Sequence, residues 1–243
     1  MSHPTARDHL IVALDVPVLD EAYRLVSVLG ESVSYYKVGL ELLFAGGLDL
    51  ARDLRRQGKS VFLDMKLLDI GNTVERAVAN ASELGVNMLT VHGHDLKTLR
   101  AAVSGRGSTS LKLLAVTVMT NLTADDLKQQ GSNLSPADLV LHRARLAYES
   151  GFDGVIASGQ EAANIRAATG PGFLIVTPGI RLPGSSTDDQ ERVMTPDHAI
   201  AAGADHIVVG RPITQADDPK TAAESFLHHI RETLRGRGSR LTH

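Results

Sequence analysis

The densest group of reactive side chains lies in residues 64–69, where Asp64, Lys66 and Asp69 form a D-x-K-x-x-D pattern. Residues two apart on a strand point to the same side, so Asp64 and Lys66 should share a face, with Asp69 near enough to return as a second carboxylate. Lys37, in the apolar segment YYKVG, would complete an alternating group of two cations and two anions. Charged groups are rarely buried unless they are paired, and this alternation supplies the pairing.

The arrangement favours proton transfer over covalent amine chemistry. A lysine that forms a Schiff base must be neutral, which requires an apolar pocket or a neighbouring cation. Two carboxylates beside Lys66 favour its ammonium form and should outweigh the opposing effect of Lys37. We therefore predict that Lys66 is a proton donor and a fixed cation. A divalent metal is disfavoured, because the lysines occupy the space between the acids. The alternative is an ion-pair network that only maintains the fold, although such networks stabilise proteins weakly.

Two segments near the C-terminus have the composition of a phosphate site. Residues 177–190 offer backbone N–H groups, Arg181 and Gln190, and Gly210-Arg211 stand where a helix would begin after an apolar segment. Helix N-termini and the backbone N–H groups of such loops bind anions. We predict that both segments contact a phosphate.

The histidines offer a weaker signal. His92 and His94, next to Asp95, could form a metal-binding pair, but no carboxylate cluster with suitable spacing accompanies them. A hydrogen-bonded histidine at a strand end is the favoured interpretation of His92. His228 and His229 are expected on a surface helix.

Short apolar segments must position these groups. Each contains four to eight residues and lacks the alternation of a half-exposed strand, which is typical of parallel strands buried on both faces. There are eight: 10–14, 35–39, 60–64, 87–91, 111–118, 153–157, 173–177 and 206–210. Helix-start signals of a capping residue followed by proline stand between them at Ser135, Thr195 and Asp218, and helix-end glycines at Gly58, Gly85, Gly151 and Gly203.

Eight strand–helix units in 243 residues predict a (β/α)₈ TIM barrel. We expect one domain over residues 1–243, with polar loops at 121–134 and 181–194 and a flexible tail from about residue 235. The alternative is a doubly wound open sheet, which more often uses five or six strands. In a barrel the chemistry lies at the C-terminal ends of the strands, and phosphate binds after strands seven and eight.

Composition excludes several classes of protein. The chain has 25 Lys and Arg against 28 Asp and Glu, so no basic excess suggests a nucleic-acid or membrane surface. The absence of cysteine excludes a disulfide framework, a thiol nucleophile and a zinc–thiolate site. No apolar run approaches the roughly 18 residues of a membrane span, and the N-terminal residues lack the pattern of a signal peptide. We expect a soluble, cytoplasmic protein.

In its motifs the chain resembles the orotidine 5′-phosphate decarboxylase family of the bacterial type. The resemblance runs from LIVALDV at 10–16 to VVGRPIT at 208–214. Between them, in the order of the family, stand Lys37, DMKLLDIGNTV, TVH at 90–92, AVTVMT at 115–120, TPGIR at 177–181 and DQ at 189–190. Related barrels that process 3-keto-gulonate 6-phosphate or hexulose 6-phosphate share D-x-K-x-x-D, but they carry a metal-binding Glu where this chain has Lys37.

The resemblance implies the loss of CO₂ from orotidine 5′-monophosphate to give UMP in pyrimidine synthesis, without a cofactor or metal. It assigns catalysis to Lys66, as proton donor to ring carbon C6, together with Asp64, Lys37 and Asp69. It also implies a set of substrate-binding residues: Asp15 and Lys37 for the ribose, Thr120 for the pyrimidine, Arg181, Gln190 and Arg211 with Gly210 for the phosphate, and Thr73.

The resemblance further implies a homodimer with shared active sites, in which Asp69 and Thr73 reach into the site of the partner. Leu67 and Leu68, which precede Asp69, would be costly to leave in water and could be buried in such an interface. Two alternatives to this enzyme stay open. One is a metal-dependent sugar-phosphate barrel, and the other is a non-catalytic barrel that only binds a nucleotide, against which intact Asp64 and Lys66 argue.

Overall fold

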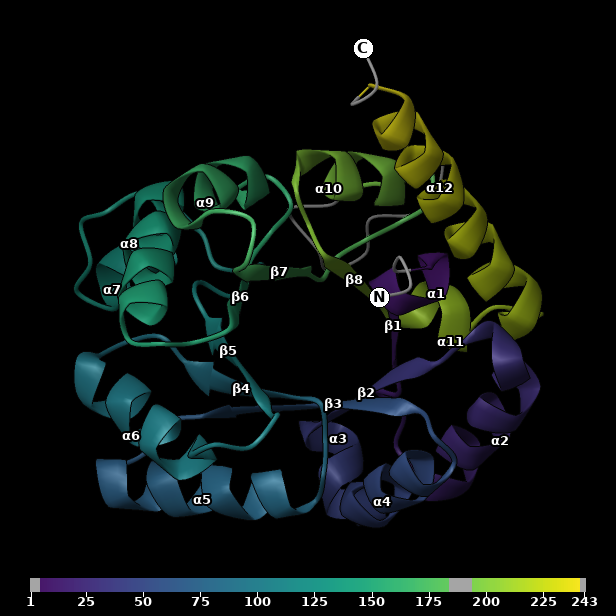
Figure 1. The fold of residues 1–243 in the computed structure, drawn as a ribbon, viewed down its shortest axis with the longest axis horizontal. Coiled ribbons are helices and arrows are strands. Elements are labelled where there is room, and N and C mark those ends of the chain that lie inside the picture. Colours follow the sequence, from purple (N-terminus) through teal and green to yellow (C-terminus); the bar gives the residue numbers. More distant parts are fainter. Residues whose placement is uncertain (1–4, 184–193, 241–243) are drawn as a thin grey trace.

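The computed structural model describes residues 5–183 and 194–240, with side chains to residue 236. Parallel strands pair in sequence order and close into a barrel, as Figure 1 shows from one end. The strands are β1 (Leu10–Ala13), β2 (Tyr35–Gly39), β3 (Ser60–Leu67), β4 (Met88–His92), β5 (Lys112–Val116), β6 (Gly154–Ile156), β7 (Leu174–Thr177) and β8 (His206–Val209). The predicted (β/α)₈ barrel is confirmed, and the open-sheet alternative is wrong because β8 pairs with β1.

Helices surround the barrel on its outside (Figure 1). Those of one turn or less are α1 (Ala6–His9), the 3-10 turn η1 (Gly30–Ser32), α3 (Leu40–Leu42), the π-turn η2 (Leu43–Gly47) and α11 (Arg211–Thr214). The longer ones are α2 (Leu19–Leu29), α4 (Leu48–Arg56), α5 (Gly71–Glu83), α6 (Leu96–Arg106), α7 (Ala124–Gln129), α8 (Pro136–Glu149), α9 (Ala162–Thr169), α10 (Pro196–Ala202) and α12 (Pro219–Arg240).

Most predicted helix boundaries agree with the structure. The Ser135 hydroxyl accepts the N–H of Asp138 at the start of α8. Asp218 Oδ1 accepts the N–H groups of Lys220 and Thr221. Thr195 precedes α10 as predicted, but its side chain makes no capping bond and instead contacts His198 Nδ1 at 3.0 Å. The four glycines predicted to end helices all have positive φ, between 68° and 114°.

The strands are buried on both faces, which explains why their sequences do not alternate. One apolar layer lies between the sheet and the helices, and a smaller cluster fills the barrel interior. Tyr35, Phe62 and Met88 belong to the interior cluster. Residues two further along the same strands share that face, so β2, β3 and β4 also direct Lys37, Asp64 and Thr90 inward, nearer the C-terminal end.

Strand β3 is longer than the predicted 60–64 and is irregular where the charged motif begins. Leu63 pairs with Leu89 but Leu67 pairs with Val91, so three residues of β3 oppose the single residue Thr90. Within this bulge Lys66 has φ 49°, and among the described residues it alone is a non-glycine with positive φ. The bulge redirects the chain at the lysine predicted to do chemistry.

The loop predicted at residues 121–134 and the C-terminal segment lie at the periphery of the barrel. The predicted loop 121–134 contains the short helix α7, which begins at a capping box formed by Thr123 and Asp126. At the C-terminus α12 continues to Arg240, and the flexibility of the tail from about residue 235 stays a prediction. Within residues 5–183 and 194–240, no helix is both long enough and apolar enough to cross a membrane.

Candidate active site

Four charged residues form a linear network at the C-terminal end of the barrel: Lys37 on β2, Asp64 and Lys66 on β3, and Asp15, two residues after β1. Lys37 Nζ lies 2.7 Å from Asp15 Oδ1 and 3.4 Å from Asp64 Oδ2. Lys66 Nζ donates to the same Asp64 Oδ2 at 2.7 Å. The charges therefore alternate in the order Asp15, Lys37, Asp64, Lys66, with two cations and two anions as predicted.

The observed network differs from the predicted one in its second anion, which is Asp15 and not Asp69. Asp69 is exposed, and its Oδ1 accepts the N–H of the adjacent Ile70 at 2.7 Å. Among the described residues of this chain it forms no ion pair. The expectation that Asp69 of the same chain returns to Lys66 is therefore wrong, since the chain leaves the barrel mouth after Leu67.

The network holds Lys37 and Asp64 in their charged forms. Burial opposes the charge of Lys37, but Asp64 and Asp15 outweigh burial and raise the Lys37 pKa. Burial also opposes the charge of Asp64, but Lys37 and Lys66 outweigh it and lower the Asp64 pKa. The side chain of Asp64 is 12% exposed and that of Lys66 is 31% exposed, so Lys66 is the more open to a ligand entering the barrel mouth.

Gly39 allows the Asp15–Lys37 pair to form. A Cβ atom on Gly39 would lie 2.7 Å from Asp15 Oδ1 and 2.9 Å from Lys37 Nζ, closer than van der Waals contact permits. Gly39 has no chemical signature in the sequence, although its position two residues after Lys37 places it on the same face of the strand.

Thr90 also joins the network and was not among the predicted site residues. It is fully buried, and its hydroxyl donates to Asp64 Oδ1 at 2.9 Å and accepts the backbone N–H of Lys66 at 2.9 Å. Its place in the TVH motif was the only available signal, because threonine is common in strands for other reasons.

His92 is the last residue of β4, and the charges of Lys66 and Asp64 both act on its ring. Its Nδ1 is buried and has no hydrogen-bond partner among the described residues, and a hydrogen-bonded His92 stays a prediction. Its ring lies 4.7 Å from that of His94 between centroids. Burial, with His94, Lys66 and Arg143, lowers the His92 pKa to about 4. Among the described residues, no cluster of three or more His, Cys, Asp or Glu could hold a metal ion.

The predicted phosphate residues follow β7 and β8, which are neighbours in the barrel. Arg181 is buried, and its Nη1 donates to the carbonyl of Ile180 at 3.0 Å. Gly210 caps α11 and Arg211 is its first residue, as predicted. Gln190 lies outside the described residues.

The two other predicted contacts, Thr120 and Thr73, follow strands β5 and β3, which β4 separates in the barrel. Thr120 is half-buried in the segment after β5. Thr73 is exposed in the first turn of α5, four residues after Asp69. Neither residue is brought into the four-residue network within one chain.

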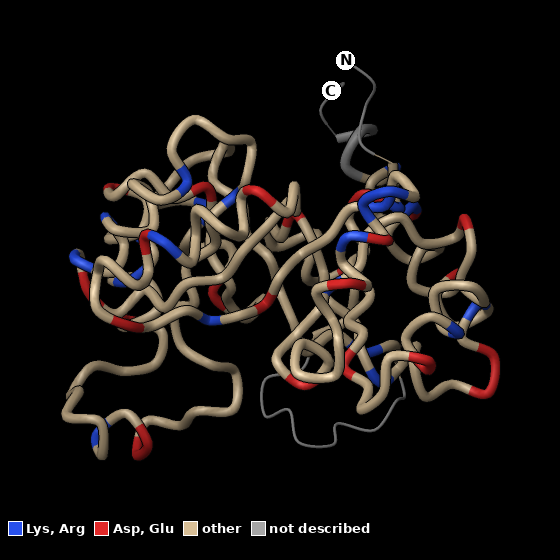
Figure 2. Tube along the Cα trace, turned by 90° about the horizontal axis from the view of Figure 1, so that it is seen from below, with Lys and Arg blue, Asp and Glu red and all other residues tan. Residues whose placement is uncertain are grey.

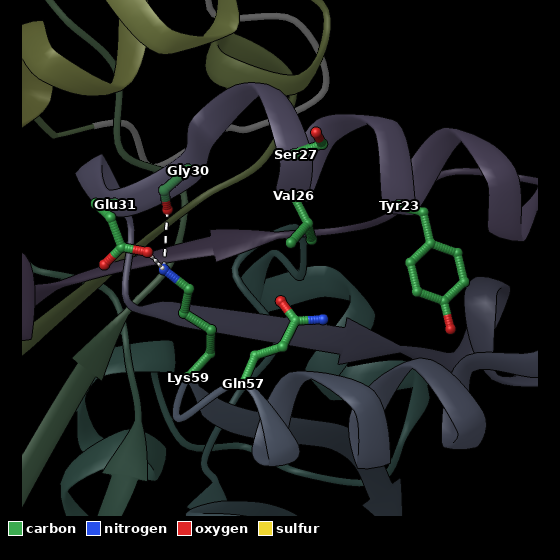
Figure 3. A pocket seen from close by; sticks show the side chains of 7 residues that line it. All are labelled: Tyr23, Val26, Ser27, Gly30, Glu31, Gln57 and Lys59. Atoms are coloured by element: carbon green, nitrogen blue, oxygen red, sulfur yellow. Dashed lines mark hydrogen bonds and ion pairs between the residues drawn. The ribbon is translucent and has the colours of Figure 1, made fainter.

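A separate pocket of about 320 Å³ lies at the other end of the barrel, next to the start of β3. Figure 3 shows Lys59 reaching from it to the Gly30 carbonyl and Glu31, at 2.9 and 3.0 Å. Because catalysis in barrels belongs to the opposite end, this pocket is not the candidate site. Figure 2 shows acidic and basic residues interspersed along the described trace.

Comparisons with known proteins agree with the geometry. Residues 8–226 match the model of the Orotidine 5′-phosphate decarboxylase / HUMPS family. The chain is 54% identical to an orotidine 5′-phosphate decarboxylase of Afipia carboxidovorans, over 92% of this chain and 95% of the relative. It is 52% identical to that of Rhodopseudomonas palustris strain BisA53, over 93% and 95%. A crystal structure of the Lactobacillus acidophilus decarboxylase has a TM-score of 0.80 at 38% identity and covers 91% of this chain and 98% of its own.

Proposed function

Because the chain belongs to the Orotidine 5′-phosphate decarboxylase / HUMPS family, we propose that it acts without a cofactor and with Lys66 as the proton donor. The chain is an orotidine-5′-phosphate decarboxylase, a carboxy-lyase of pyrimidine biosynthesis that converts orotidine 5′-monophosphate to UMP. The observation that carries the proposed mechanism is the Lys66 ammonium, 2.7 Å from Asp64 at the open end of the charge network.

The reaction breaks the bond between ring carbon C6 and the carboxylate carbon, and the electron pair stays on C6. A cation fixed beside that carbon stabilises the developing charge because it needs no reorganisation. Lys66 then transfers its proton to C6 and becomes a neutral amine, which water reprotonates. Asp64 orients Lys66 and keeps a negative charge near the departing carboxylate.

The remaining predicted residues contact parts of the substrate that are remote from the bond that breaks. Lys37 and Asp15 bind the ribose hydroxyl groups, and Thr120 bonds the pyrimidine. Arg181 and Arg211, with Gln190 and the backbone at Gly210, bind the phosphate. The binding energy of the phosphate is used to position the ring and to close loops.

The active enzyme is a homodimer in which Asp69 and Thr73 enter the partner's site. The support is a set of exposed apolar side chains in the segments that follow the neighbouring strands β2 and β3. They are Leu40, Phe44, Leu68 and Ile70, which are 46%, 88%, 51% and 73% exposed. Leu67 does not contribute, because it packs against its own core. Burial of such side chains stabilises a dimer. The proposed location is the cytoplasm.

Activity without a metal separates this proposal from the metal-dependent sugar-phosphate barrels. Purified protein is added to orotidine 5′-monophosphate with a chelator present, and the absorbance of the nucleotide is followed. The proposal expects absorbance to fall to that of UMP at the same rate with and without chelator. Turnover that stops with chelator and returns on adding a divalent metal would contradict cofactor independence.

A further inference from the structure

The hydroxyl of Thr90 bridges two residues of the charge network, Asp64 and Lys66. It donates its single proton to Asp64 Oδ1 at 2.9 Å and accepts the N–H of Lys66 at 2.9 Å. Both Lys66 and Lys37 lie against the other oxygen of Asp64, Oδ2, at 2.7 and 3.4 Å. Thr90 thus fixes the rotation of the carboxylate, because each oxygen has its own partner.

The second bond of Thr90 acts on the backbone. Lys66 has φ 49°, a left-handed conformation that costs a non-glycine residue free energy and persists only when its surroundings hold it. At this bulge the register between β3 and β4 breaks, and the Thr90 hydroxyl is the acceptor for the Lys66 N–H. A side chain therefore holds the strained residue where the strand ladder is interrupted.

We propose that Thr90 is a positioning residue for the decarboxylation, because its hydroxyl sets the direction of the Lys66 backbone and the rotation of the Asp64 carboxylate together. This inference rests on the proposed role of Lys66 as proton donor. Without the hydroxyl, Asp64 can turn away from Lys66, and the Lys66 backbone can relax toward an ordinary strand. The distance from Nζ to the reacting carbon then varies, and proton transfer is sensitive to such displacement.

A positioning role and a purely structural role predict different kinetics. Thr90→Val keeps the shape of the side chain and removes both hydrogen bonds, while Thr90→Ser keeps the hydroxyl and removes a methyl group. If Thr90 positions Lys66, Thr90→Val lowers kcat about 10- to 100-fold, as expected for lost bonds to a charged group. KM for orotidine 5′-monophosphate and Kd for UMP change by no more than about twofold, because ribose and phosphate contacts remain. Thr90→Ser recovers most of kcat.

The control is Thr169→Val on α9, which removes another buried threonine hydroxyl, one that donates only to the Ile165 carbonyl. It should leave kcat unchanged. The inference is overturned if Thr90→Val turns over like wild type, or if folded Thr90→Ser is as impaired as Thr90→Val. If Thr90→Val does not fold, Thr90→Ser decides alone, since a near-wild-type kcat supports the inference and a 10-fold loss overturns it. Absence of turnover in the wild type would overturn the proposed function itself.

Discussion

His92, at the end of β4, is kept neutral by its surroundings. Burial and the neighbouring His94, Lys66 and Arg143 lower its pKa from 6.5 to about 4, and Asp64 opposes them. Between these two pH values the unfolded chain binds a proton that the folded chain does not. The free energy of unfolding is therefore unaffected by His92 above about pH 6.5 and falls as the pH drops toward about 4.

Replacing His92 with leucine should flatten this acid dependence. From pH 7 to pH 5 the free energy of unfolding should fall less in His92→Leu than in wild type, by about 1 kcal/mol after allowance for solvent screening. Urea unfolding at the two pH values measures this difference. His228→Leu, at an exposed histidine on α12, is the control and should keep the wild-type dependence. The same pH dependence in His92→Leu and wild type would contradict the assignment.

Sequence reasoning predicts the chemistry of single residues only where strand periodicity links them. It paired Asp64 with Lys66 correctly, because alternate residues of a strand share a face. It chose Asp69 in place of Asp15, because the choice depends on the pairing of Ala13 with Lys37 across β1 and β2. It missed Thr90, because a threonine in a strand has no chemical signature until its partners are known.

At the scale of elements, the end of β2 brings Asp15 and Lys37 together because Gly39 has no side chain. In Gly39→Ala the added Cβ would meet Asp15 Oδ1 and Lys37 Nζ, the mobile ends of two side chains, so the protein should still fold. The pair must separate, and we expect kcat/KM to fall at least about 10-fold through lost ribose contacts. Steady-state kinetics on folded variants tests this expectation. The control is Gly172→Ala, where the added Cβ meets no atom within 4 Å, and it should have wild-type kinetics. Equal kcat/KM values for Gly39→Ala and Gly172→Ala would contradict the proposed role of Gly39.

The start of α11 makes a second prediction at this scale. Arg211→Ala should raise KM for the nucleotide and lower kcat/KM about 10- to 100-fold, because charge-assisted contacts contribute roughly 1.5–3 kcal/mol each. Orotidine, which lacks the phosphate, should be a poor substrate that the substitution barely affects further. Arg235→Ala on exposed α12 is the control. An equal fall in kcat/KM for both substrates would show that Arg211 does not act through the phosphate.

Element positions follow well from sequence, whereas irregularities within elements do not. Uninterrupted apolar runs predicted all eight strands, because parallel strands buried on both faces leave that pattern. The extension of β3 to Leu67 and its bulge opposite Thr90 were not predictable. They arise from register with β4 and from a hydrogen bond between distant residues, and neither appears in the local sequence.

For the whole molecule, counting strand–helix units was enough to predict the barrel, but one chain leaves Asp69 outside its own network. In the proposed dimer each site takes Lys66 from one chain and Asp69 from the other. Lys66→Ala and Asp69→Ala homodimers should then both be nearly inactive. In a mixed dimer one site carries both substitutions and the other carries neither. Random reassembly of equal amounts makes about half the dimers mixed, so about a quarter of all sites should recover.

Subunit exchange is verified separately, with a tag on one variant and mass measurement of the mixture. A mixture of Lys66→Ala with wild type is the control, because it forms no new intact sites. If exchange occurs and activity does not return in the Lys66→Ala and Asp69→Ala mixture, Asp69 serves the site of its own chain. The shared-site proposal would then be wrong.

The central claim is that Lys66 supplies the proton to C6, and turnover by Lys66→Ala measured beside its UMP binding tests it most directly. The account predicts that Lys66→Ala folds and binds UMP but has no measurable turnover, because the substitution removes stabilisation made in the transition state. Lys220→Ala, at an exposed lysine of α12, should keep wild-type turnover. Wild-type turnover by Lys66→Ala would contradict the claim.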